Sequence, residues 1–186
     1  MNRLQIFGMG WLIAVLGSCS TPGSASVTGA TATLINTSGT KIGEATFAER
    51  DDKPGVVIRI RVWNLPPGVH GFHIHDSGSC ETPEFTTAGG HFNPYGKKHG
   101  LKNPEGPHAG DLPNLVVRSN GTAEVTLEAR LVTLKPGANS LLTPKGTSLV
   151  IHADPDDEMS DPAGKSGARI ACGIIRGSAP STIEAR

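Results

Sequence analysis

Residues 56–62 read Val-Val-Ile-Arg-Ile-Arg-Val, and this stretch decides the fold class. From Ile58 onward, apolar residues alternate with Arg59 and Arg61. That period of two places successive side chains on opposite faces of a β-strand. An amphipathic helix would instead repeat its apolar residues every three or four positions. The stretch therefore predicts a strand with one face on a core and its arginines on the other face.

Comparable short stretches recur on both sides of this strand. The expected strands are residues 30–36, 41–48, 56–65, one centred on Phe72 and Ile74, and residues 115–118, 123–129, 148–152 and 169–175. Asn120-Gly121, between two of them, is a strong hairpin signal. The chain has 24 glycines and 14 prolines, and helix-period patterns are scarce. About eight short strands predict an all-β, antiparallel sandwich or barrel.

Two long stretches between the strands have no regular pattern, residues 76–113 and 153–168. Loops longer than roughly 12–15 residues are uncommon in compact domains and are usually functional or disordered. The first loop holds His91, His99, His108 and Asp111. Because metal binding can supply folding energy, a metal would explain how so polar a loop is ordered.

Six of the seven histidines fit two ligand sets that share one member. His73 and His75 are two apart in a strand, so their rings project from the same face. With His152 at the end of another strand and His91 from the loop, they form a set of four nitrogen donors, which suits Cu(II). A bare His-x-His is a weak signal, because exposed strand histidines are at least as common as ligands.

The second set is His91, His99, His108 and Asp111, which gives three nitrogens and one carboxylate. Such a set suits a closed tetrahedral Zn(II) site without an open position. His91 belongs to both sets, and an imidazole has two ring nitrogens, so it can bridge two metals once it is deprotonated.

The N-terminus is predicted to be a targeting segment. After Arg3, residues 7–16 form an apolar run that is too short for a membrane span and fits a secretory signal. Residues 16–19, Leu-Gly-Ser-Cys, resemble the bacterial lipobox, in which Cys19 is lipidated. A plain signal peptide, an uncleaved anchor and a cytosolic start are the alternatives. The expected layout is a lipoprotein signal peptide (1–18), a lipidated flexible tether (19–28), one domain (29–178) and a C-terminal tail (179–186).

Cysteines and charge bound the function further. If Cys19 carries lipid, Cys80 and Cys172 remain as a pair, and an oxidising compartment allows them to form a disulfide. The alternative is two free buried thiols. The chain has 17 basic and 17 acidic residues. It shows no basic run interleaved with aromatic residues, so nucleic acid is not an expected partner.

The motifs together resemble those of the copper/zinc superoxide dismutase family, bacterial secreted lipoprotein type. The matching stretches are Gly-Phe-His-Ile-His at 71–75, Gly-Gly-His-Phe-Asn-Pro at 89–94, His-Ala-Gly-Asp-Leu at 108–112, and Gly-Ala-Arg-Ile-Ala-Cys-Gly at 167–173. The resemblance runs from about residue 29 to residue 177. It implies a flattened, eight-stranded, Greek-key β-barrel with two long functional loops.

The resemblance also implies a role for each site residue. Copper would be held by His73, His75, His91 and His152, and zinc by His91, His99, His108 and Asp111. Asp156 would hydrogen-bond one histidine of each set, His70 would be structural, and Arg169 would attract the anion. The implied disulfide joins Cys80 to Cys172 and so helps to place Arg169.

The implied activity is the disproportionation of superoxide to molecular oxygen and hydrogen peroxide, with one copper and one zinc per subunit. Copper would cycle between Cu(II) and Cu(I), and His91 would release copper and take a proton during the cycle. The expected partners are superoxide, a membrane through the lipid on Cys19, and possibly a second copy in a homodimer. The expected location is the cell envelope, which the enzyme would protect from superoxide.

Two other classes of function fit parts of the pattern. A copper-binding or copper-delivery lipoprotein on the same fold would turn over little, and loss of a copper histidine or of Arg169 would signal it. A structural or adhesive envelope protein would use zinc alone, but the four-nitrogen set with His152 argues against it. The second long loop is acidic, with Asp154, Asp157 and Asp161 among others, which could weaken the steering of an anion.

Overall fold

The computed structural model describes residues 29–50 and 52–178. These residues form nine strands and one short 3-10 helix: β1 (Gly29–Asn36), β2 (Lys41–Glu49), β3 (Val56–Val62), β4 (Gly68–His70), β5 (Phe72–His75), η1 (Thr86–Ala88), β6 (Leu115–Val117), β7 (Ala123–Ala129), β8 (Thr147–His152) and β9 (Arg169–Ser178). The predicted signal peptide, Cys19, tether and C-terminal tail lie outside the described residues. Within those residues, no helix is long and apolar enough to cross a membrane.

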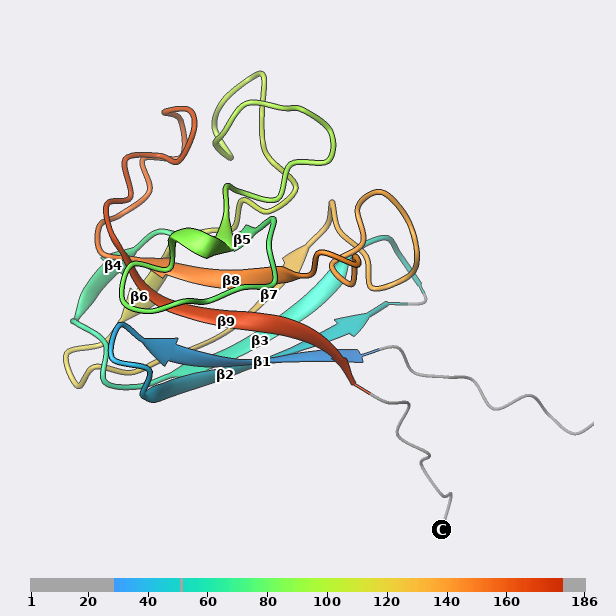
Figure 1. Ribbon diagram of the computed structural model, residues 1–186. Coiled ribbons are helices and arrows are strands. Elements are labelled where there is room, and N and C mark those ends of the chain that lie inside the picture. Colours follow the sequence, from blue (N-terminus) through green and yellow to red (C-terminus); the bar gives the residue numbers. More distant parts are fainter. Residues whose placement is uncertain (1–28, 51, 179–186) are drawn as a thin grey trace, which may run out of the picture.

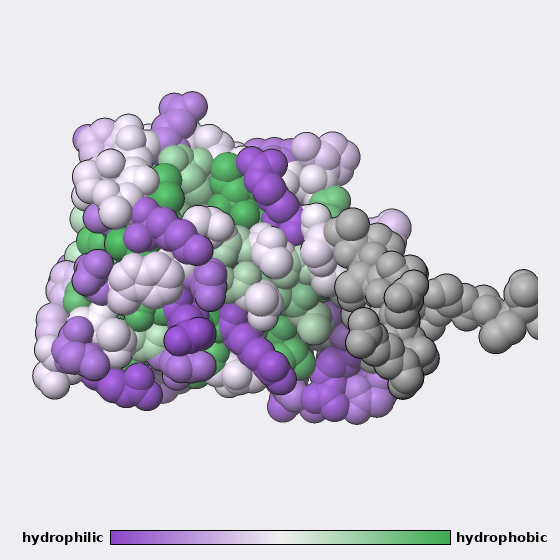
Figure 2. Space-filling view, turned by 90° about the horizontal axis from the view of Figure 1, so that it is seen from below, coloured by the Kyte–Doolittle hydropathy of each residue, from purple (hydrophilic) through white to green (hydrophobic). Residues whose placement is uncertain are grey.

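Seven strands form one curled antiparallel sheet in the order β5-β8-β9-β1-β2-β3-β7, and β4 pairs with β6 in a second, small sheet (Figure 1). The predicted all-β antiparallel architecture is therefore confirmed. β3 alternates as expected: Ile58 and Ile60 are fully buried, whereas Arg59 and Arg61 are exposed. Figure 2 shows the side of the molecule on which β1 and β2 lie, where hydrophilic side chains are interspersed with smaller apolar areas.

The core fills the inside of the curled sheet. Its largest fully buried side chains include Leu34, Phe47, Phe72, Leu149 and Ile151, which come from strands far apart in the sequence. Burying side chains of this size contributes about 1.5–3 kcal/mol each. The strands that carry the histidines therefore rest on a packed support.

The predicted strand around Phe72 is two strands, so the structure has nine strands where about eight were expected. The break is at Gly71, where an added Cβ would lie 2.6 Å from Ser166 Cβ. Gly71 instead bonds to the second long loop, because its N–H donates to the Asp154 carbonyl at 2.8 Å. Before the break the chain pairs with β6, and after it with β8.

The predicted hairpin at Asn120-Gly121 is only half right. The turn is present, since the Gly121 N–H donates to the Arg118 carbonyl and the Arg118 N–H to the Thr122 carbonyl. However, the flanking strands belong to different sheets: β6 pairs with β4, and β7 pairs with β3 along all seven of its residues. The longer ladder with β3 decides the partner of β7.

Both long loops lie over the β5–β8 end of the sheet, where Figure 1 shows them above β8. The first contains η1 as its only helix, and two isolated bridges tie it to β5: His73 with Asp111, and His75 with His91. These bridges bring the loop histidines to the strand histidines.

Candidate metal centre

Three predicted copper ligands come from neighbouring strands. β5 pairs with β8 so that His73 lies opposite Val150 and His75 opposite Ser148. His152 ends β8, and all three histidines are at most 4% exposed. The bridge between His75 and His91 adds the fourth ring from the loop. The four rings offer one nitrogen each within 4.8 Å of one another.

Each of these four rings uses one nitrogen for a hydrogen bond and leaves the other without a partner. The bonded pairs are His73 Nε2 with Asp156 Oδ2 (2.7 Å), His75 Nδ1 with the Gly89 carbonyl (3.0 Å), His91 Nδ1 with Asp111 Oδ1 (2.9 Å) and His152 Nδ1 with the Gly167 carbonyl (3.2 Å). The opposite nitrogens, His73 Nδ1 and Nε2 of the other three, are buried and have no partner. An unmade bond of this kind costs about 1–3 kcal/mol, so four converging lone pairs fit a metal ion.

The environment keeps three of these imidazoles, those of His75, His91 and His152, neutral. Burial, with a smaller contribution from neighbouring His91, holds the pKa of His75 well below its ordinary value. Burial also lowers the pKa of His91 to about 4, although Asp111 opposes it, and that of His152 to about 3. Neutral imidazoles present free lone pairs at pH 7, and an all-nitrogen set suits Cu(II).

The predicted zinc ligands converge on one carboxylate oxygen. Asp111 Oδ1 lies 2.9 Å from His91 Nδ1, 3.1 Å from His99 Nδ1 and 3.3 Å from His108 Nδ1. The Nδ1 atoms of His91 and His108 are 3.4 Å apart. Tetrahedral zinc with bonds of about 2.0–2.1 Å holds its ligand atoms about 3.3–3.4 Å apart, so the set is already close to that geometry.

Charge is distributed differently in this second set. Asp111 Oδ2 accepts the N–H groups of Gly100 and His108, each at 2.9 Å. Burial would raise the pKa of Asp111, but its hydrogen bonds to three histidines, His108 first, hold it far below the ordinary range. Burial would likewise lower the pKa of His99, yet Asp111 and Asp156 together raise it to about 9. In the absence of metal, the set holds a carboxylate beside an imidazolium.

Asp156 connects the two sets. Its Oδ2 bonds to His73 Nε2 at 2.7 Å and its Oδ1 to His99 Nε2 at 3.0 Å. Asn114 fixes its backbone from both sides, donating to the Asp156 carbonyl at 2.9 Å and accepting its N–H at 2.8 Å. Sequence reasoning missed Asn114 and the carbonyls of Gly89 and Gly167, because nothing in the local sequence marks them.

The remaining predicted residues lie around the first set. Arg169 is opposite His152 in the β8–β9 ladder, and its guanidinium donates to the carbonyls of Phe85 and Gly89, each at 2.6 Å. Burial lowers the pKa of Arg169, with Asp76 opposing the shift, and Arg169 still carries its charge at pH 7. His70 belongs to neither set, because its ring nitrogens face the carbonyl oxygens of His152 and Pro66, at 2.8 and 2.9 Å.

The predicted disulfide is present. Cys80 in the first long loop is bonded to Cys172 in β9, with 5.7 Å between their Cα atoms. The bond ties the loop that supplies Phe85 and Gly89 to the strand that supplies Arg169. The loop and the guanidinium are therefore held together by both covalent and hydrogen bonds.

Sequence comparison decides the family. The signature described as copper/zinc superoxide dismutase (SODC) matches residues 41–175. The chain belongs to the copper/zinc superoxide dismutase family. It is 54% identical over 147 residues to superoxide dismutase (Cu-Zn) 2 of Aquifex aeolicus (strain VF5). The aligned residues cover 78% of this chain and 85% of the relative.

More distant members of this dismutase family agree with the match. The superoxide dismutase-like protein YojM of Bacillus subtilis (strain 168) is 44% identical over 146 residues, covering 77% of this chain and 74% of that protein. The crystal structure of a SOD-like protein from Bacillus subtilis superposes with a TM-score of 0.75 at 42% identity, covering 77% of this chain and 96% of that one. The predicted dismutase fold, enzyme class, superoxide disproportionation and pair of metals, one copper and one zinc per subunit, are confirmed.

Proposed function

We propose that the two ligand sets divide the metals of this dismutase between them. His73, His75, His91 and His152 hold copper, and His91, His99, His108 and Asp111 hold zinc. The observation that carries this division is the convergence of four buried, unpartnered ring nitrogens in the first set. The second set combines three imidazole nitrogens with a carboxylate oxygen, and both are donor types that bind Zn(II) tetrahedrally.

When bound, copper supplies the one-electron oxidation and reduction of superoxide, and zinc supplies a fixed charge without redox chemistry. Arg169 attracts the anionic substrate with a permanent charge, and its two bonds to carbonyls fix that charge beside the copper set. His91 offers Nε2 to one set and Nδ1 to the other. His91 Nε2 is therefore the atom that holds and releases a proton during turnover.

Asp156 and the disulfide position these groups. Asp156 sets the ring orientation of His73 and His99 by accepting from the nitrogen that faces away from each metal. The Cys80–Cys172 bond keeps the carbonyls of Phe85 and Gly89 against Arg169.

The test of this assignment is superoxide consumption by residues 20–186 loaded with copper and zinc, compared with zinc alone, at several salt concentrations. Fast, copper-dependent consumption that falls with salt supports the assigned roles. Copper that binds without turnover would favour the copper-carrier function instead, with Arg169 and the acidic loop as the regions to examine.

We also propose that the protein is a bacterial lipoprotein of the cell envelope. The support is the sequence: residues 1–18 as signal peptide, lipid on Cys19, a tether to residue 28, one domain at 29–178 and a tail at 179–186. The Cys80–Cys172 disulfide is consistent with export to an oxidising compartment. There the enzyme would protect the envelope from superoxide. Mass spectrometry of the mature N-terminus tests the lipid, and Cys19→Ser should move the protein out of the membrane fraction.

A homodimer is part of the proposal. Val69 and Val116 lie opposite each other in the β4–β6 ladder and are 41% and 65% exposed, so they form a small apolar patch that a second copy could cover. Sedimentation of residues 20–186, with Val116→Glu as the comparison, should show a dimer that the substitution dissociates.

A further inference from the structure

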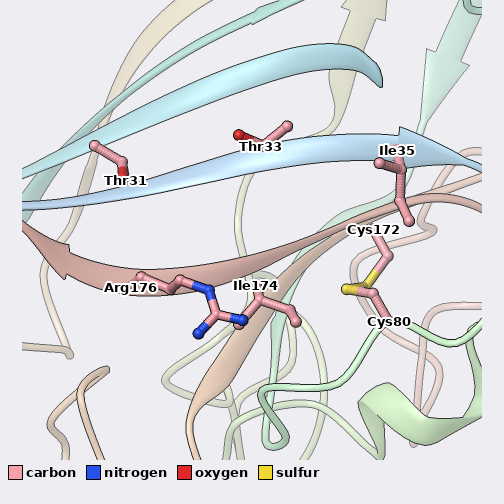
Figure 3. A pocket seen from close by; sticks show the side chains of 7 residues that line it. All are labelled: Thr31, Thr33, Ile35, Cys80, Cys172, Ile174 and Arg176. Atoms are coloured by element: carbon pink, nitrogen blue, oxygen red, sulfur yellow. A yellow bond between two sulfur atoms is a disulfide. The ribbon is translucent and has the colours of Figure 1, made fainter. Parts of the chain in front are cut away.

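A hollow of about 270 Å³ lies beside the disulfide on the outer face of β1 and β9, and no residue of either metal set lines it (Figure 3). Its lining residues are Thr31, Thr33 and Ile35 from β1, Ile174 and Arg176 from β9, and the disulfide of Cys80 with Cys172. The metal-based reaction uses none of its polar side chains. Its size suits a small molecule rather than a protein surface.

The hollow has a different chemical group at each end. The β1–β9 ladder places Thr31 opposite Arg176 at one end and Ile35 opposite Cys172 at the other. Cys172 and Arg176 are four residues apart on the same face, which is about 13 Å along the strand. Figure 3 shows the disulfide at one end and the Arg176 guanidinium extending along the hollow toward Ile174. A ligand that reaches both ends must carry its anionic group several bonds from its reactive atom.

The guanidinium is available to such a ligand. Arg176 is exposed, and no carboxylate lies within the 4.0 Å that defines an ion pair among the described residues. No Asp or Glu is among the residues that line the hollow. Two exposed threonines, Thr31 and Thr33, add hydroxyl groups that donate or accept hydrogen bonds.

The two sulfurs differ in access. Both cysteines line the hollow, but Cys172 is 0% exposed whereas Cys80 is only half-buried. Thiol–disulfide exchange proceeds by attack of a thiolate on one sulfur, and the rate depends on access to that sulfur. Cys80 is therefore the sulfur that an incoming thiolate reaches.

We propose that this hollow binds a small anionic thiol, of the size of a short peptide, and directs it to Cys80. The carboxylate pairs with Arg176, and the thiolate sulfur bonds to Cys80 Sγ while the bond to Cys172 Sγ breaks. Cys172 leaves as a thiolate and takes a proton. A second thiol then attacks the mixed disulfide, which releases Cys80 as a thiol and the small molecule as its own disulfide, so two thiols supply the two electrons.

The same site serves the reverse reaction, in which the small-molecule disulfide closes the Cys80–Cys172 bond. Closure is the direction that an oxidising compartment favours. Opening would free the loop whose Phe85 and Gly89 carbonyls hold Arg169. This effect on turnover rests on the function proposed for Arg169, whereas the exchange reaction itself does not.

The experiment measures exchange directly, without an activity assay. The mature protein, loaded with copper and zinc, is treated under argon with reduced glutathione or with 2-mercaptoethanol as the neutral thiol. Alkylation and mass spectrometry give the rate of disulfide opening and the cysteine that carries the adduct. A parallel zinc-only sample checks that copper does not take part. We expect Arg176→Gln to slow the reaction with glutathione about two- to fivefold and to leave the reaction with 2-mercaptoethanol unchanged.

The matched control is Arg59→Gln, which removes an exposed arginine of β3 that does not line the hollow. It should change neither rate, and the glutathione adduct should be on Cys80. Equal slowing of both thiols by Arg176→Gln, no slowing of either, or an adduct on Cys172 would overturn the proposal. None of these outcomes depends on dismutase activity, so they leave the proposed function to its own test.

Discussion

The copper set and the zinc set have different structural supports. His73, His75 and His152 lie on β5 and β8, whose ladders and core packing hold the backbone without any metal. His99, His108 and Asp111 lie on a long loop whose only regular element is η1. Their convergence depends on bonds to a single carboxylate, Asp111. A rigid scaffold thus fixes one half of the centre, and local charge fixes the other.

The two halves also differ in protonation. The strand-borne rings of His75 and His152, and the ring of His91 that both sets share, have lowered pKa values and are neutral at pH 7. His99 has a raised pKa of about 9 and is charged at pH 7. The strand-borne half is therefore ready for a metal, whereas the loop-borne half must lose a proton to accept one.

His152 gives the strongest test of whether the copper set is structurally independent of the zinc set. We expect His152→Ala to lower turnover by more than about a hundredfold, since it removes a direct copper ligand, while zinc binding and the fold stay intact. Turnover, metal content by mass spectrometry and circular dichroism measure the three quantities. Loss of zinc, or unfolding, would show that the two sets are not separable in this way.

Asp111 tests the loop-borne half. Asp111→Asn removes a buried charge that three histidines and two backbone N–H groups contact, so the metal-free protein should lose about 3 kcal/mol of unfolding free energy. Amide exchange should rise in the loop around residues 92–110 and stay low in β5 and β8. The control is Glu105→Gln, which neutralises an exposed carboxylate in the same loop and should change neither the stability nor the exchange. Equal loosening of β5 would contradict the independence of the strand-borne half.

Asp156 tests the connection between the halves. Asp156→Asn keeps the shape but weakens acceptance from His73 and His99, so both copper and zinc affinity should fall, each by about 10–100-fold. Competition with a chelator measures both constants. If only one metal were affected, Asp156 would serve one set alone.

Arg169 sharpens the comparison from the substrate side. Arg169→Glu should slow turnover about tenfold and make the rate rise with salt, because the charge beside the copper set then repels the anion. Metal content should stay unchanged. Arg59→Glu is the control, because it makes the same change of net charge at an exposed position of β3 outside both ligand sets. It should leave the turnover rate nearly unchanged. Unchanged kinetics for Arg169→Glu would remove Arg169 from the mechanism.

The smallest expected effect is the release of a single proton when zinc binds. At pH 7.5, zinc binding to the metal-free protein should release about one proton, from His99, whose pKa is about 9. His91, with a pKa of about 4, is already neutral. Calorimetry in buffers of different ionisation enthalpy counts the protons, and the number should fall to zero as the pH rises through 9. Because the pKa of His99 is higher in the folded protein than its ordinary value of 6.5, protonated His99 stabilises the metal-free fold. This contribution is complete below pH 6.5 and is lost as the pH rises through about 9.

Much of this architecture could be predicted from local patterns. The alternation around Arg59 and Arg61 predicted a one-sided strand, and the spacing of His73 and His75 placed two rings on one face. Both predictions rest on strand periodicity, which a few residues are enough to determine. The ligand sets were predicted from residue types and spacing, and the structure brings the candidate ligand atoms of each set within 4.8 Å of one another.

Other features were decided only when distant segments met. The close approach of Ser166 breaks the strand at Gly71, and the ladder with β3 takes β7 away from its expected hairpin partner. Asn114 reaches Asp156, and Arg176 comes to lie in the same hollow as Cys80, through contacts that no local spacing encodes. The sequence by itself determined which residue types could bind metals and which segments are strands, since both depend on neighbours in the chain. The tertiary structure decided which backbone carbonyls orient the histidines, that Asn114 supports Asp156, and where the hollow lies, because these depend on which segments pack together.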